Sequence, residues 1–224
     1  MVKERKCGME DVGVINTIAF NLIFVVGILG IVTFLSFRGM RNRYALRDKF
    51  LEDEKKANAA RARDVEAHFY FKPDLDSLPI RETTNAEVDK KQKYVQKRGN
   101  LTMLRFPEKM TNLQLKSLYG LANLEKIVTY ENNYNTYVSA LVDWADTLIS
   151  KGGEQEKTDA ILILEETVTL DSEYRKTYMH LADYYSETGK YENLNNLIDR
   201  VTVLFSDEGI KKQLIQYIMD KREA

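Results

Sequence analysis

The side chains of this sequence that could do chemistry are mainly carboxylates, because histidine and cysteine are scarce. The chain has two histidines, His68 and His180, and one cysteine, Cys7. Two histidines this far apart lack the spacing of a zinc site, and a single cysteine allows no intrachain disulfide. The G-x-x-x-x-G-K-[ST], G-x-S-x-G and H-E-x-x-H motifs are absent. We therefore predict no metal site and no cofactor.

Four acids gather around one predicted helix end: Glu165, Glu166, Asp171 and Glu173. Paired carboxylates can act as general acid and base. A solvated helix surface is the simpler explanation, since charged side chains are mostly exposed. We therefore predict that the protein is not an enzyme and has no small-molecule substrate. An active site assembled from acids remote in sequence stays open as an alternative.

Charge is divided unevenly along the chain. Residues 38–99 carry 16 basic and 11 acidic side chains, whereas residues 100–224 carry 14 and 20. Basic stretches such as Lys90–Lys93 resemble nucleic-acid patches. However, they lie near a predicted membrane segment, and the folded part that follows is acidic. We predict no nucleic-acid partner.

A long uncharged segment predicts one transmembrane helix. Between Asp11 and Arg38 lie 26 residues without a charged side chain, rich in Ile, Leu, Val and Phe. A helix of this length reaches about 39 Å, more than the ~30 Å hydrocarbon core requires. The segment is too long for the apolar part of a signal peptide, and no small-residue cleavage site follows it. We predict a tail over residues 1–11 and an uncleaved single-pass helix over residues 12–37.

Lysine and arginine predict the orientation of this helix. Three basic residues precede it, whereas the first four charged residues after it are all arginines. These membrane-flanking residues are Arg38, Arg41, Arg43 and Arg47. Because the flank richer in lysine and arginine stays in the cytoplasm, we predict a cell-membrane protein with its N-terminus outside and its C-terminal domain cytoplasmic. Recruitment of specific anionic lipids by the arginines is the alternative to a topology signal.

The stretch after the membrane helix is predicted to connect it to a folded domain. Residues 38–68 are basic and free of proline, so we expect a juxtamembrane helix or stalk. Residues 69–110 contain all three prolines of the chain, which interrupt regular helix. The aromatic run Phe69–Phe71 either docks a partner or, as we favour, lies over the domain. We expect residues 82–99 to form an exposed or partly disordered helix.

From residue 111 onward the apolar spacing is helical, and part of it repeats. Five residues recur 37 positions later: Leu141, Trp144, Ala145, Leu148 and Gly152 correspond to Tyr178, Leu181, Ala182, Tyr185 and Gly189. In the next helix the offset is 34: Ala160, Leu164, Thr167 and Ser172 correspond to Leu194, Ile198, Val201 and Ser206. The sequence predicts a domain over 111–224 with helix pairs at about 138–172 and 175–206 and a capping helix over 208–221.

This spacing resembles the tetratricopeptide repeat, in which a large residue is followed by a large–Ala pair, a further large residue and a glycine at the turn. Tyr178-x-x-Leu181-Ala182-x-x-Tyr185 followed by Gly189 carries the resemblance best. Proline is missing at the end of each unit, and Leu194 and Thr167 depart from the pattern. The expected fold is all-α: a single N-terminal transmembrane helix and a tetratricopeptide-like array of antiparallel helix pairs with flanking helices.

The resemblance implies that side chains of the first helix in each pair line a concave groove that binds peptides. On this sequence the groove residues are Ser139, Val142, Asp143, Asp146 and Ile149, then Lys176, Met179, His180, Asp183 and Glu187. Acids dominate, so capture of a free C-terminal carboxylate is disfavoured and a basic or amphipathic segment is favoured. A solvated face, or one covered by the basic connector, is the alternative.

The function predicted from these features is that of a single-pass membrane-anchored adaptor or scaffold. Its partners would be the lipid bilayer and one or more proteins of unspecified identity, bound by the tetratricopeptide-like domain. The alternative is a small accessory subunit of a membrane complex, assembled through the transmembrane helix. Asn16, Asn21, Gly27 and Gly30 are the residues that support this second interpretation.

Overall fold

The structure is a computed structural model that describes residues 10–223, with the side chains of residues 10–26, 38, 39 and 41–43 outside the description. The described chain is helical apart from two short strands, so the all-α prediction is confirmed. It divides into two compact units, residues 1–60 and residues 61–224.

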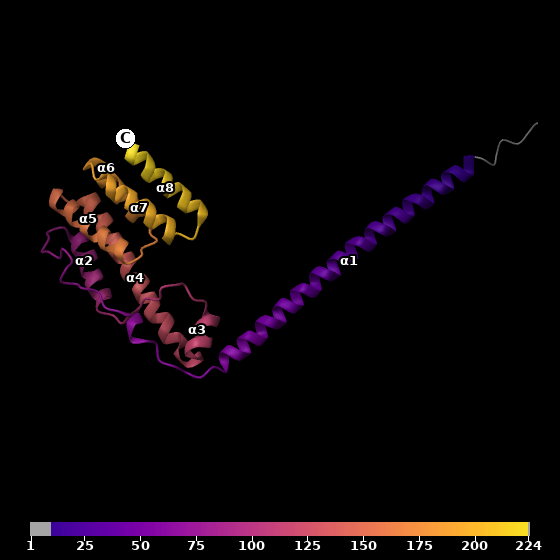
Figure 1. Ribbon diagram of the computed structural model, residues 1–224, viewed down its shortest axis with the longest axis horizontal. Helices are drawn as coiled ribbons and strands as arrows, with labels where there is room; N and C mark the ends of the chain where they lie inside the picture. Colours follow the sequence, from indigo (N-terminus) through magenta and orange to yellow (C-terminus); the bar gives the residue numbers. More distant parts are fainter. Residues whose placement is uncertain (1–9, 224) are drawn as a thin grey trace, which may run out of the picture. The chain divides into compact units, whose positions relative to one another are not determined.

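The first unit is one helix, α1 (Glu10–Asn58), which is continuous over 49 residues (Figure 1). Among the residues whose side chains are described, no helix is both long and apolar enough to cross a membrane. Residues 12–26 of the predicted span lie outside those residues. The transmembrane helix at 12–37 is therefore not confirmed and stays a prediction.

Helix α1 ends at Asn58, earlier than the predicted end at His68. The backbone beyond it is held by the second unit. The Arg63 amide donates to the Tyr119 carbonyl over 3.1 Å, and the side chain of Asn123 donates to the Arg63 carbonyl over 2.7 Å. These tertiary bonds outweigh the helix propensity of the alanine-rich stretch.

Most of the predicted connector is part of the second unit. A short 3-10 helix, η1 (Ala67–Phe69), leads into strand β1 (Tyr70–Phe71), which pairs antiparallel with β2 (Met103–Leu104). Phe71 packs against the main core, where its ring meets the ring of Tyr134 edge-on at 5.1 Å between centroids. The aromatic run therefore lies over the domain, as favoured from the sequence.

The stretch expected to form an exposed or partly disordered helix over residues 82–99 contains helix α2 (Ala86–Gly99), which packs against α4 on one side. Val88 and Val95 are buried at 3% and 0% exposure. The side chain of Gln92 pairs with the backbone of Arg81, accepting from its amide at 3.1 Å and donating to its carbonyl at 2.9 Å. Three inward-facing residues thus hold a helix whose other positions are mainly charged.

Helices α3 (Asn112–Tyr119) and α4 (Leu121–Lys151) are separated by a single residue, Gly120. Its φ of +81° and the approach of Ala62 both require glycine, because a Cβ would lie 2.7 Å from the Ala62 Cα. Helix α4 begins before residue 138, where the first predicted pair starts. Its N-terminal half packs with α3 and β2 around a second core cluster of Leu104, Leu115, Tyr119 and Ile127.

The remaining helices follow one another through short loops (Figure 1). They are α5 (Glu154–Thr169), α6 (Arg175–Glu187), α7 (Tyr191–Leu204) and α8 (Glu208–Glu223). Contacts join α4 to α5, α5 to α6 and α6 to α7, and α8 packs on both α6 and α7. The two predicted helix pairs therefore correspond to the C-terminal half of α4 with α5 and to α6 with α7, followed by α8 at the predicted capping position.

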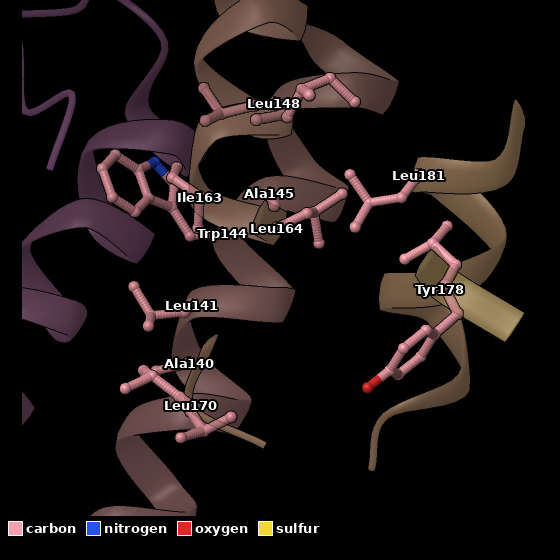
Figure 2. Close-up of a cluster of buried hydrophobic side chains, with 14 of the residues drawn as sticks. Ala140, Leu141, Trp144, Ala145, Leu148, Ile163, Leu164, Leu170, Tyr178 and Leu181 are labelled. Carbon is pink, nitrogen blue, oxygen red and sulfur yellow. The ribbon is translucent and has the colours of Figure 1, made fainter. Parts of the chain in front are cut away.

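The residues that repeat in the sequence occupy equivalent buried positions in the two pairs. Leu141, Trp144 and Ala145 have 0% exposure, and so do their counterparts Tyr178, Leu181 and Ala182. Figure 2 shows Leu181 facing the side of α4 that carries Ala145 and Leu148, with Leu164 between them. The small Ala145 and Ala182 side chains allow neighbouring helices to approach closely.

Thr167 is a polar residue at a position where the repeat pattern has an apolar one. Buried hydrogen bonds explain why it is tolerated there. Its hydroxyl donates to the Leu164 carbonyl over 2.8 Å and lies 3.3 Å from the Thr177 hydroxyl. Both threonines have 0% exposure. A buried hydroxyl with partners is tolerated, whereas one without them would destabilise the domain.

The C-terminal helix ends the array with a polar surface. Leu214 and Ile218 are buried at 0% exposure against the preceding helices. The opposite side carries the exposed residues Lys212, Gln213, Gln216 and Asp220. A terminal helix of this type covers the last apolar face of a repeat array and prevents further stacking.

The equivalence of the two pairs predicts equivalent mutational effects. Ala145→Leu and Ala182→Leu should each lower the free energy of unfolding by about 1–3 kcal/mol, because there is no space for the larger side chain. Ala122→Leu, at an exposed position of α4, should change it by less than about 0.5 kcal/mol. Denaturant unfolding can be followed by the fluorescence of Trp144, the only tryptophan. Equal effects of all three substitutions would contradict this packing.

Candidate functional site

The aspartates of the predicted groove form a series of ion pairs between successive helices. Asp143 of α4 lies 3.5 Å from the Lys91 ammonium of α2. Asp146, one turn further along α4, lies 2.8 Å from Lys176 and 3.0 Å from the His180 ring, both on α6. These acids therefore join α2, α4 and α6.

The same arrangement continues to the last helix. Asp183 of α6 is 2.7 Å from the Lys221 ammonium of α8 and accepts a hydrogen bond of 2.7 Å from the Tyr217 hydroxyl. We call the pairs of Asp143, Asp146 and Asp183 the aspartate ladder. Each of its acids has a cation from a neighbouring helix, so the acidic groove expected from the sequence is largely neutralised by the domain itself.

The pKa values of three ladder residues, Asp146, Lys176 and Lys221, are shifted in the directions that ion pairing requires. The hydrogen bond from Lys176, and then that from His180, lowers the pKa of Asp146. The same contact with Asp146 raises the pKa of Lys176. At the next step, Asp183 raises the pKa of Lys221. All of these groups are partly exposed, so solvent screens the pairs and each one is worth little on its own.

The apolar residues of the predicted groove are less available than expected. Val142 has 3% exposure and is not on the surface. Met179 and Ile149 are partly buried against the main core. Ser139 is likewise half-buried. Besides the ladder acids, two residues of the predicted groove are exposed. They are Lys176, which pairs with Asp146, and Glu187.

Four of the predicted groove residues do converge on one cleft of about 570 Å³. They are Ile149 at the end of α4 and His180, Asp183 and Glu187 on α6. Residues of α5 and the end of α6 complete the lining: Glu154, Lys157, Thr158, Ile161, Tyr184 and Thr188. We call this the α5–α6 cleft. Its volume falls in the range of about 300–1,000 Å³ that is typical of binding sites.

Local sequence signals set the walls of the cleft. Helix α4 ends at Lys151, and Gly152 and Gly153 form the turn that starts α5. The Gly153 amide donates to the Glu156 carboxylate over 3.0 Å, which caps the N-terminus of α5. On the other wall α6 ends at Glu187, and Gly189 at φ +68° reverses the chain. The two turns expected from the repeated glycines therefore border the site.

The charges of the cleft are unequal. Three carboxylates line it, those of Glu154, Asp183 and Glu187, against the single ammonium of Lys157. Lys157 lies 2.8 Å from Glu154, and this contact, with a smaller effect of Glu187, raises the pKa of Lys157. Because Glu154 is paired with Lys157 and Asp183 with Lys221, Glu187 is the lining carboxylate that has no ion pair among the described residues.

Three of the four carboxylates considered as a potential active site, those of Glu165, Asp171 and Glu173, have structural partners. Asp171, at φ +53° after α5, is paired with Arg105, which precedes α3, and with Arg200 of α7 at 2.8 Å. Glu173 is 2.7 Å from Lys109. Glu165 accepts a hydrogen bond of 2.8 Å from the Tyr185 hydroxyl. Within the described residues no group of histidine, cysteine or acidic side chains could hold a metal ion.

The membrane-flanking arginines are described only in part. The side chains of Arg38, Arg41 and Arg43 lie outside the described residues. Arg47 is exposed and pairs with its neighbour Asp48 at 3.2 Å. The predicted role of the four arginines as a topology signal therefore stays a prediction.

Sequence reasoning missed the α5 wall of the cleft. Only residues of the first helix in each pair were assigned to the groove, because the family resemblance implies that placement. The ladder cations Lys91 and Lys221 were missed as well. One signal was present: Asp146 and Lys176, like Asp183 and Lys221, lie about one repeat apart, which is the separation of side chains that face each other on successive first helices.

Comparisons with known proteins identify no relative. No protein-family model matches the chain, no curated protein matches its sequence, and no solved structure matches its fold. The resemblance to the tetratricopeptide repeat stays a prediction from residue spacing. The site must be interpreted from its own geometry.

The ladder predicts a pH dependence of stability. Because the pKa of Asp146 is lowered in the folded state, its contribution is present above its unfolded pKa of about 3.9 and is lost as the pH falls through the lower folded value. Asp146→Asn should therefore lower the melting temperature at pH 6, and the difference from wild type should shrink below pH 4. Asp199→Asn, exposed on α7, is the control. A difference that stayed constant with pH would refute this role of Asp146.

Proposed function

We propose that this protein is a single-pass membrane-anchored adaptor whose helical-repeat domain binds a protein partner. The observation that carries the proposal is the α5–α6 cleft, in which apolar and charged side chains converge between the two helix pairs. The cleft has about 570 Å³ and combines Ile149, Ile161 and Tyr184 with three carboxylates. Docking requires this combination of apolar contact area and orienting polar groups.

The rest of the domain supports binding rather than catalysis. Three of the four carboxylates that could have formed an active site outside the cleft, those of Glu165, Asp171 and Glu173, contact tyrosine, arginine or lysine. The outward side of α8 carries Lys212, Gln216 and Asp220, a polar surface of the kind found on terminal helices of repeat domains. A packed helical domain that carries this cleft suits the presentation of a surface to another protein.

The anchor is proposed from the sequence. The 26 uncharged residues between Asp11 and Arg38, followed by four arginines, are the supporting observation. A membrane anchor would hold the cleft near a bilayer and so raise its effective concentration toward partners in the same membrane. The resemblance of the repeat spacing to the tetratricopeptide family agrees with a binding role.

The single cysteine makes the proposed topology testable. Cys7 lies in the tail before the proposed span, so a membrane-impermeant maleimide should label it in intact cells. In a Cys7→Ser variant that carries Gln216→Cys on the exposed side of α8, labelling should require permeabilisation. The reverse pattern would invert the topology, and labelling of both sites in intact cells would exclude a cytoplasmic domain.

Photo-crosslinking in native membranes tests the docking role. A photoreactive amino acid at Tyr184, which lines the cleft, should give a discrete adduct with a partner protein. The same amino acid at Gln216, exposed on α8, should give none. The adduct should be lost with Ile149→Glu, provided that the fluorescence of Trp144 shows a native fold.

An adduct that forms equally from both positions would remove the cleft as the docking surface. Partner association that survives Ile149→Glu but is lost when residues 12–37 are replaced by another apolar helix would favour the alternative function, an accessory subunit assembled through its membrane helix. A partner that needs the cleft therefore supports the adaptor, and a partner that needs residues 12–37 supports the accessory subunit.

A further inference from the structure

We infer that the α5–α6 cleft recognises an amphipathic helix of the partner protein that carries lysine or arginine. Glu187 would be the main residue that binds the lysine or arginine side chain. This inference rests on the proposed docking function and specifies the chemistry of its partner. It departs from the sequence prediction in one respect: the aspartates that dominate the predicted groove are assigned to holding the array together.

The acids of the groove and the cleft differ in whether they already have a cation as partner. Asp143 and Asp146 lie in the ladder and are neutralised by Lys91 and Lys176. Asp183 reaches the cleft but is paired with Lys221 at 2.7 Å. Glu187 also lines the cleft and makes no ion pair within the described part of the chain. It is therefore the acid best able to accept a partner's cation.

The position of Glu187 strengthens its negative field. It is the last residue of α6, and the last turn of that helix contains no basic residue. The C-terminus of a helix carries a partial negative charge, which is stabilised by a nearby cation. Thr188, the C-cap of α6, itself lines the cleft. The end of α6 therefore adds to the charge of Glu187 in the same place.

Lys157 shows that this field acts on an ammonium group inside the site. Its pKa is raised first by Glu154 and further by Glu187 across the cleft. Lys157 pairs with Glu154 one turn away on its own helix. A lysine or arginine of the partner could instead pair with Glu187, which lies on the opposite wall of the cleft.

The apolar part of the cleft selects an amphipathic partner over a purely basic one. Ile149 and Tyr184 are partly buried against the core, and Ile161 has 8% exposure. The three apolar side chains can contact one or two aliphatic residues of the partner. The charged residues that line the cleft lie beside them. A helix that places an aliphatic residue and a cation three or four positions apart presents both on one face.

Model peptides test this chemistry directly. The full-length protein in nanodiscs of phosphatidylcholine would be titrated with a labelled 15-residue helix of leucine, alanine and lysine with one apolar stripe. The comparison is the same peptide with every lysine replaced by glutamate, and empty nanodiscs measure binding to lipid. We expect saturable binding of the lysine peptide alone, weakening as salt is raised.

The matched variants are Glu187→Lys and Glu192→Lys. Both residues are exposed, but Glu192 lies on α7 outside the cleft. Glu187→Lys should weaken binding of the lysine peptide at least tenfold, while Glu192→Lys should change it less than twofold. Glu187→Gln, which keeps the size of the side chain, should give an intermediate loss. Unchanged fluorescence of Trp144 would show that each variant is folded.

Equal binding of the two peptides, or equal effects of Glu187→Lys and Glu192→Lys, would overturn the inference. If the crosslink from Tyr184 to a native partner persists in that case, the docking function stands with a partner of different chemistry. If the crosslink is absent while the lysine peptide binds with the predicted charge dependence, the proposed docking of a membrane partner fails and the chemical preference of the cleft remains.

Discussion

The packing of α4 against α2 on one side and α5 on the other is the interaction on which the rest of the second unit depends. Leu141, Trp144 and Ala145 have 0% exposure at this junction. Figure 2 shows the indole of Trp144 beside the ribbon of α2 and Leu164 of α5 near Ala145. The helix also continues N-terminally to contact α3 and β2. Because α4 takes part in both core clusters, displacing it would separate the aromatic run Phe69–Phe71 from helices α5 to α8.

Charge in this domain serves two purposes that the sequence does not distinguish. Several acids join one element to another: the aspartate ladder links α2, α4, α6 and α8, and Asp171 holds the end of α5 to Arg105 and Arg200. Such partly exposed pairs contribute little energy singly, but they set the relative positions of helices. Glu187 has a different position: it makes no ion pair among the described residues, and it lies in the α5–α6 cleft close to apolar side chains.

Much of the fold was predictable because helical periodicity and repetition are local or nearly local signals. The spacing of Tyr178, Leu181, Ala182 and Tyr185 predicted their common burial, and the recurrence of that spacing predicted a second helix pair. Helix α2 was underestimated, since its few buried residues, including Val88 and Val95, hardly stand out among charged neighbours. The early end of α1 depends on bonds from Arg63 to residues near position 120, which no local pattern reveals.

For the candidate site, the sequence by itself determined that acids dominate the predicted groove positions, but it placed Val142 on that surface although the residue is buried. It also determined the uncharged segment at 12–37 from which an anchor is proposed. Only the tertiary structure decided that Asp146 and Asp183 are neutralised by lysines about one repeat away, and that Glu154 and Ile161 of α5 share a cleft with Glu187 of α6. The physical reason is that ion pairing and burial depend on distances between helices, whereas periodicity reports only the orientation of a side chain on its own helix.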